Sequence, residues 1–166
     1  MHKPLVSIIA ASYNHAAFVV ETLESIRLQT YENIELIITD DGSNDNSVAV
    51  IKKWILQHNV SCTFLVNEQN EGICKTFNKG LASCKGKYFQ VIACDDIMVA
   101  HKIERQVYFL EAATDNLAMV HTDAIIIDKS SQVLPELFKN YKKNKEESYK
   151  SNDFERLIQQ NHVIAP

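Results

Sequence analysis

The sequence predicts an α/β fold, in which a mostly parallel central sheet is covered by helices on both faces. Short apolar runs alternate along the chain with segments whose apolar residues recur at helical spacing. Repeated strand–helix–strand units give parallel strands joined by right-handed crossovers. The 166 residues, of which 46% are hydrophobic and 23% charged, suffice for a single domain without a metal or disulfide staple.

Five short apolar runs are predicted to be strands. The first is apolar throughout except for Ser7, which is typical of a strand buried on both faces. In chain order, the predicted strands are Leu5–Ala11, Ile34–Thr39, Cys62–Val66, Tyr88–Ala93 and Met119–Ile127.

Four helices are predicted between these strands. The second helix has a candidate N-cap at Asp45 or Asn46, and the third ends before Gly86. A short further helix is expected after Ser151, where Ser-Asn-Asp precedes an apolar pattern. The four helices are expected near residues 18–27, 48–55, 73–84 and 103–110.

Composition and charge exclude several classes of protein. The formal net charge of −4 argues against a nucleic-acid-binding protein. The four cysteines form no CxxC pair and the six histidines form no HExxH motif, so we expect free thiols in a reducing cytosol. No membrane-spanning run or convincing secretory signal is present. The charged run Lys139–Lys150 is predicted to be a mobile loop, with contact to an anionic substrate or membrane surface as the alternative.

Polar side chains follow three of the predicted strands. Ser12-Tyr13-Asn14 comes after the first strand, Asp40-Asp41 after the second, and Asp95-Asp96 after the fourth. In open α/β sheets, ligands bind beyond the carboxyl ends of the strands. Carboxylates gathered at one edge repel one another unless a cation joins them, and Mg²⁺ or Mn²⁺ prefers such oxygen ligands.

The third helix offers a possible contact for a phosphate. Gly72 precedes it, a helix start favours an anion, and Lys75 lies one turn inside. The sequence contains neither a P-loop nor a GxGxxG motif, which argues against common nucleoside triphosphatases and dinucleotide enzymes.

Four ordered motifs carry a resemblance to a known family. They are VSIIAASYNH, ESIRLQTYENIELIITDDGSNDNS, NEGICKTFNKGL and IACDDI, and together they extend over nearly the whole chain. In order and spacing they resemble the family 2 glycosyltransferases. The resemblance implies a GT-A fold, which is a Rossmann-like three-layer sandwich, and transfer of a sugar from a nucleotide donor, often a UDP-sugar, with inversion at the anomeric carbon. Residues 1–166 would then form one nucleotide-sugar-binding domain.

The resemblance also implies roles for individual residues. Ala11 and Tyr13 would line the base pocket, and Asp41 would accept a hydrogen bond from the base. Asp95 and Asp96 would bind the ribose and the metal–diphosphate, with Mn²⁺ or Mg²⁺ as the metal. The expected nucleotide-binding set is Ala11, Ser12, Tyr13, Asp41, Lys75, Asn78 and Asp95, and the expected metal ligands are Asp95 and Asp96.

Three departures from the family pattern bear on these roles. The frequent DxDD motif is here Ala93-Cys94-Asp95-Asp96, and Phe77 replaces the arginine of NxGxxxARNxG, which makes Lys75 the candidate cation for the diphosphate. The family places its catalytic base and acceptor-binding part beyond the position of Pro166. The base is therefore unassigned within this chain, and Asp123 is a weak candidate.

The leading hypothesis is an inverting glycosyltransferase of bacterial surface polysaccharide or glycolipid synthesis. It would act in the cytoplasm, at the inner face of the membrane if it makes a peripheral contact there, on a nucleotide-sugar donor and a saccharide or lipid-linked acceptor. A binding module without transfer activity and a nucleotidyltransferase remain alternatives, although the glycine-rich basic loop of the latter is absent. A phospho-receiver domain also gathers acids at strand ends, but it would not explain the third motif.

Overall fold

The computed structural model describes residues 3–113 and 117–134. The chain divides into two compact units, Met1–Val120 and His121–Pro166, which are described separately. The charged run at 139–150 and the helix expected after Ser151 lie outside the described residues. Among the helices of the described part, none has both the length and the apolar character needed to cross a membrane.

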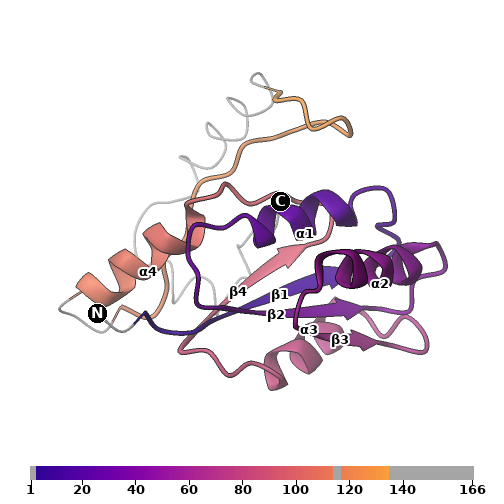
Figure 1. The fold of residues 1–166 in the computed structure, drawn as a ribbon, viewed down its shortest axis with the longest axis horizontal. Helices are drawn as coiled ribbons and strands as arrows, with labels where there is room; N and C mark the ends of the chain where they lie inside the picture. Colours follow the sequence, from indigo (N-terminus) through magenta and orange to yellow (C-terminus); the bar gives the residue numbers. More distant parts are fainter. Residues whose placement is uncertain (1–2, 114–116, 135–166) are drawn as a thin grey trace, which may run out of the picture. The chain divides into compact units, whose positions relative to one another are not determined.

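The first unit is built on a four-stranded sheet (Figure 1). The strands are β1 (Val6–Ser12), β2 (Ile34–Asp40), β3 (Cys62–Val66) and β4 (Tyr88–Ala93). Their order is β3-β2-β1-β4, and every neighbouring pair is parallel. All seven residues of β1 are buried, as the apolar run predicts for a central strand covered on both faces.

Four helices cover the two faces of the sheet: α1 (Val19–Arg27), α2 (Ser47–His58), α3 (Ile73–Ala82) and α4 (Lys102–Ala112). Alternate residues of β1 point to opposite faces. Ile8 belongs to a core cluster with Leu23 of α1, and that cluster also contains residues of α2 and α4. Ile9 faces the other way, toward Gly80 of α3. The predicted α/β fold with helices on both faces is thus confirmed.

The predicted fifth strand is wrong. Most of residues 117–134 form no regular secondary structure, and Ile127 makes only an isolated antiparallel bridge with Val133. Met119 and Ile125 are exposed. A tight turn follows, in which Asp128 accepts hydrogen bonds from the backbone of Ser130 and Gln132. The apolar run had suggested a strand, but a strand needs neighbours for its backbone groups, and here the pairing is limited to this turn.

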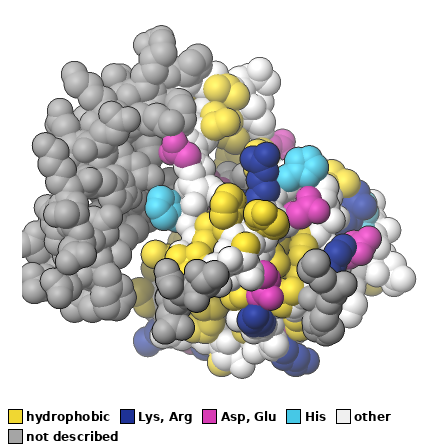
Figure 2. Space-filling view, turned by 90° about the vertical axis from the view of Figure 1, so that its left-hand side faces the viewer, with side chains coloured by type: hydrophobic (Ala, Val, Ile, Leu, Met, Phe, Trp, Pro, Cys, Tyr) yellow, Lys and Arg dark blue, Asp and Glu magenta, His cyan; other side chains and the backbone are white. Residues whose placement is uncertain are grey.

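Figure 2 views the side at which the strands begin, which is at the left of Figure 1. Hydrophobic side chains gather near the middle of this view, with charged side chains around them. A hollow of about 360 Å³ lies between the end of α1 at Arg27, the start of β2 at Ile34, and Val60 before β3. None of the predicted site residues lines this hollow, so the amino ends of the strands are not where the predicted chemistry gathers.

Candidate functional site

The predicted site residues other than Lys75, Asn78 and Asp123 lie at the carboxyl ends of β1, β2 and β4. The parallel register pairs Ser12 with Asp40 and Ala11 with Ala93, so the three polar loops that follow these strands begin side by side. A pocket of about 180 Å³ opens at this edge. It is lined by Ala11, Ser12, Tyr13, His15, Asp41, Asn70, Gly72, Ile73, Thr76 and Ala93.

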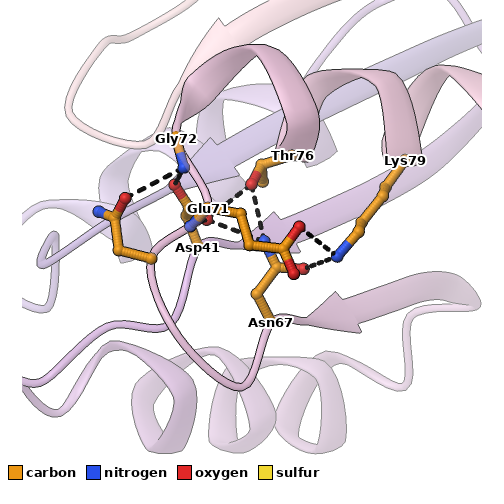
Figure 3. A network of polar contacts seen from close by, with 7 residues as sticks. Asp41, Asn67, Glu71, Gly72, Thr76 and Lys79 are labelled. Atoms are coloured by element: carbon orange, nitrogen blue, oxygen red, sulfur yellow. Dashed lines mark hydrogen bonds and ion pairs between the residues drawn. The ribbon is translucent and has the colours of Figure 1, made fainter.

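Asp40, the last residue of β2, and Asp41, which follows it, make different contacts. Asp40 is completely buried, and its two oxygens accept hydrogen bonds from the backbone N–H and the hydroxyl of Ser43 at 2.8 and 2.7 Å. These contacts close the turn after β2 and keep Asp40 out of the pocket lining. Asp41 points instead toward the start of α3 (Figure 3).

Four donors surround the Asp41 carboxylate (Figure 3). Its Oδ1 accepts hydrogen bonds from Asn67 Nδ2 at 2.8 Å, Thr76 Oγ1 at 2.7 Å and the Glu71 N–H at 2.8 Å, and its Oδ2 accepts one from the Gly72 N–H at 3.0 Å. Burial alone would raise the pKa of Asp41, but these hydrogen bonds outweigh it and lower the pKa below its ordinary value. Asp41 is therefore an ionised carboxylate held in a fixed orientation.

Lys79, in the last turn of α3, makes a second set of contacts with the loop between β3 and α3. Lys79 Nζ donates to Asn67 Oδ1 at 2.7 Å and forms an ion pair with Glu71 Oε2 at 3.0 Å (Figure 3). The amide of Asn67 thus faces a cation with its oxygen and Asp41 with its nitrogen. Sequence analysis singled out Lys75 and Asn78 on this helix, whereas the structure places Lys79 in the network.

The loop after β1 forms the rim of the pocket. Asn14 has a left-handed backbone with φ 57°, and its Oδ1 accepts a hydrogen bond from the backbone N–H of Asn44 at 2.9 Å. This contact fixes the loop against the turn after β2. Tyr13 is partly exposed at the rim, and Ser12 Oγ is buried with no hydrogen-bond partner among the described residues.

The acidic pair after β4 lies near two basic side chains. Asp95 Oδ2 is 3.6 Å from His15 Nε2. Desolvation and the negative charge of Asp95 raise the pKa of Asp96, and Lys102 at the start of α4 opposes that shift. Desolvation likewise lowers the pKa of Lys102, which Asp96 opposes. The basic side chains of His15 and Lys102 therefore offset part of the electrostatic repulsion between Asp95 and Asp96.

Asp95 and Asp96 are the predicted ligands for a divalent cation, and they follow β4 at the same edge of the sheet as the pocket. Mg²⁺ commonly takes one or two carboxylates and fills the rest of its shell with water and phosphate oxygens. In residues 3–113 and 117–134, no group of three or more His, Cys, Asp or Glu side chains could hold an ion. Water and phosphate oxygens would thus complete the shell, as is common for Mg²⁺.

The remaining predicted residues lie elsewhere. Lys75 and Asn78 are on the exposed side of α3 and do not line the pocket. Asp123 belongs to the second unit, so its role as a base stays a prediction. Sequence analysis did not assign His15, Asn70 or Thr76 to the nucleotide, although all three line the pocket. Each lies within a quoted motif, His15 in VSIIAASYNH and the other two in NEGICKTFNKGL, but the motifs did not distinguish them from their neighbours.

Comparisons with known proteins agree with this architecture. Residues 7–164 match the model of glycosyl transferase family 2. An uncharacterised glycosyltransferase of Rickettsia prowazekii is 34% identical over 134 residues, which are 81% of this chain and 41% of that protein. Another from Methanocaldococcus jannaschii is 29% identical over 99% of this chain and 54% of its own length. The chain thus spans about half or less of these relatives.

Two solved structures show the same fold at low identity. The Pyrobaculum calidifontis mannosyltransferase PcManGT, in complex with GDP-Man and Mn²⁺, has a TM-score of 0.66 and 21% identity over 84% of this chain and 39% of its own. Staphylococcus aureus TarS in complex with UDP has a TM-score of 0.59 and 22% identity over 64% of this chain and 32% of its own.

Proposed function

The chain belongs to glycosyltransferase family 2. We therefore propose that it binds a UDP-sugar and takes part in transferring the sugar, with inversion at the anomeric carbon, to an acceptor hydroxyl. The pocket at the carboxyl ends of β1, β2 and β4 would hold the nucleotide. The acidic pair Asp95-Asp96 after β4 would face the ribose and the diphosphate. Saccharides or lipid-linked saccharides are the proposed acceptors.

The observation that carries this proposal is the unequal use of the two oxygens of Asp41. Oδ1 accepts three hydrogen bonds and Oδ2 accepts one, and the side chain lines the pocket. Oδ2 therefore has a lone pair available for a donor on the ligand. The N3–H of uracil is such a donor, whereas N3 of cytosine is an acceptor and would leave the buried carboxylate facing another acceptor.

The acidic pair after β4 supports the proposed binding of the diphosphate with a divalent cation. Asp95 and Asp96 would bind Mn²⁺ or Mg²⁺ together with the diphosphate, and a bound cation would supply Lewis-acid stabilisation of the departing diphosphate. His15 lies 3.6 Å from Asp95, and Lys102 and His15 oppose the rise in the pKa of Asp96 that desolvation and Asp95 cause. The complexes of the related folds with UDP, with UDP-GlcNAc, and with GDP-Man and Mn²⁺ are consistent with a ligand of this class.

A binding module without transfer activity is the second candidate. Among the described residues, Asp41 is the only carboxylate that lines the pocket, and its donors keep it ionised and oriented toward α3. A general base must instead reach the acceptor hydroxyl. This favours a base outside the lining of the described pocket, and Asp123 is the candidate within the chain.

The cellular setting is proposed on a narrower basis. We propose a cytoplasmic protein of surface polysaccharide or glycolipid synthesis, with a peripheral contact at the inner face of the membrane. All four cysteines of the chain are free, which suits a reducing compartment.

Titration calorimetry with a panel of nucleotides tests the proposal. We expect UDP to bind in the presence of Mn²⁺, more weakly in EDTA, and on the order of ten- to a hundredfold more tightly than CDP. Release of UDP from UDP-sugars, with and without candidate acceptors, then separates a transferase from a binding module. Absence of binding by UDP and by every other nucleoside diphosphate would refute the proposed function.

A further inference from the structure

We infer that Thr76 and Asn67 are positioning residues that orient the Asp41 carboxylate, and thereby set the preference for a nucleobase that presents an N–H. The inference rests on the proposed nucleotide binding and adds to it a mechanism of base selection. Neither residue is in the predicted nucleotide-binding set, although Thr76 lies within the motif NEGICKTFNKGL, and both contact Asp41 in Figure 3.

The three side chains form a closed ring of hydrogen bonds. Thr76 Oγ1 donates its single proton to Asp41 Oδ1 at 2.7 Å and accepts a hydrogen bond from Asn67 Nδ2, also at 2.7 Å. Asn67 Nδ2 uses its other proton on Asp41 Oδ1 at 2.8 Å. Each donor proton in the ring is used once, so none of the three side chains can turn without breaking a bond.

The ring engages only one oxygen of the carboxylate. With the Glu71 N–H, Oδ1 receives three donors and its acceptor capacity is filled. Oδ2 receives the Gly72 N–H alone. Any further donor from a ligand must therefore meet Oδ2, and the orientation of Oδ2 depends on the bonds that hold Oδ1.

Burial makes these bonds hard to replace. Thr76 is 2% exposed and Asn67 is 8% exposed, so water has little access to the ring. If the Thr76 hydroxyl is removed, the carboxylate loses an anchor and can turn, and both oxygens then compete for ligand and backbone donors. The difference in affinity between a nucleotide whose base presents an N–H and one whose base presents an acceptor should then become smaller, because the carboxylate no longer offers a single fixed acceptor.

The chain offers a matched control for this change. Thr39 lies in β2, two residues before Asp41, and is 1% exposed. Its Oγ1 is buried and has no hydrogen-bond partner among the described residues. Thr39→Val and Thr76→Val therefore make the same isosteric change at two buried sites, and only the second removes a donor to Asp41.

The test compares UDP and CDP affinities by calorimetry in the purified chain with Mn²⁺, together with the melting temperature of each variant. For Thr76→Val we expect the UDP/CDP affinity ratio to fall by at least about threefold, consistent with the loss of one hydrogen bond to a charged group. Thr76→Ser, which keeps the hydroxyl, should restore the ratio, and Thr39→Val should leave it unchanged. Asn67→Ala, which changes a residue outside the helix, should lower the ratio in the same direction.

The outcomes separate this inference from the proposed function. If the unchanged protein prefers UDP and both Thr76→Val and Asn67→Ala keep the same ratio, the inference is wrong while the proposed function stands. A ratio that falls equally in Thr39→Val would also overturn the inference, because the effect would then follow from the loss of any buried threonine hydroxyl near the site. If the unchanged protein binds UDP and CDP equally, Asp41 does not select the base, and the inference is wrong. If it binds no nucleotide, both fail together.

Discussion

The imidazole of His15 and the carboxylate of Asp95 meet across the carboxyl edge of the sheet, with 3.6 Å between Nε2 and Oδ2. His15 lies in the loop after β1, where its backbone N–H donates to Ser47 Oγ at 2.9 Å. Its Nδ1 is buried without a partner among the described residues. The ring is therefore held between the base pocket, which it lines, and the acid that would face the ribose and diphosphate.

His15→Ala should weaken binding of UDP in the presence of Mn²⁺ and leave binding of uridine unchanged. The imidazole lies beside Asp95, on the phosphate side of the proposed site, and a partly exposed contact of this kind is worth about 1 kcal/mol or less. We expect a loss of up to about fivefold for UDP by calorimetry. An equal loss for uridine and UDP would instead indicate that His15 supports the base pocket.

Asp96→Asn should remove most of the Mn²⁺ dependence of UDP binding. The substitution deletes one of the two carboxylates after β4 but keeps the size of the side chain. Mn²⁺ binding, measured directly by electron paramagnetic resonance, should weaken in parallel. Asp123→Asn is the matched acid-to-amide control, since Asp123 is not proposed as a metal ligand. If Asp123→Asn binds UDP and Mn²⁺ normally but loses acceptor-stimulated UDP release, Asp123 is the base.

The sequence predicted the sheet well because its signals are local. Apolar runs placed four strands within two residues of their observed bounds, and strand ends marked Asp41 and Asp95. The prediction of a fifth strand was wrong because a strand depends on neighbouring strands that a local pattern does not reveal. Adjacent acids also look alike in sequence, and only the turn after β2 shows that Asp40 bonds Ser43 while Asp41 lines the pocket.

The residues that sequence analysis missed act through distant contacts. Thr76 is 35 positions from Asp41, and Asn67 is 26 positions from it. Threonine on a helix and asparagine after a strand are ordinary residues, and no spacing distinguishes them from other polar side chains. Their role follows from the packing of α3 against the sheet, which brings the start of the helix to the end of β2.

Gly42→Ala should destabilise the protein more than Gly72→Ala. Both glycines have a positive φ, 70° and 89°, and Gly72, with ψ 152°, lies in a region that is essentially reserved for glycine, so backbone strain costs alanine about 1–3 kcal/mol at either position. A Cβ on Gly42 would also lie 2.4 Å from the backbone carbon of Gln69, whereas a Cβ on Gly72 meets nothing within 4 Å. Chemical denaturation should show a loss of about 1–3 kcal/mol for Gly72→Ala, from backbone strain alone, and a larger loss for Gly42→Ala, where the close contact adds to the strain. Equal losses would contradict the close approach of these two loops.

The stability contributed by Asp41 should depend on pH. Its hydrogen bonds lower the folded pKa below the unfolded value, so the native state binds fewer protons at acid pH than the unfolded chain. The contribution is therefore complete above about pH 4, the ordinary pKa of an aspartate, and is lost as the pH falls through the folded value.

Asp41→Asn isolates this contribution from that of other acids whose pKa values are also lowered, such as Glu35 and Asp45. An amide presents an N–H₂ group to the donors that now meet the carboxylate, so we expect a loss of about 2 kcal/mol or more at pH 7. Urea unfolding of both proteins from pH 7 down to pH 3 measures the difference, which should narrow only below about pH 4. A difference that stays constant down to pH 3 would show that the folded and unfolded pKa values of Asp41 are equal, because the unfolded chain takes up its proton near pH 4 however low the folded pKa lies. A difference that widens between pH 7 and pH 5 would show that the folded pKa is raised. Either result would contradict the ionised, fully bonded carboxylate on which recognition of the base depends.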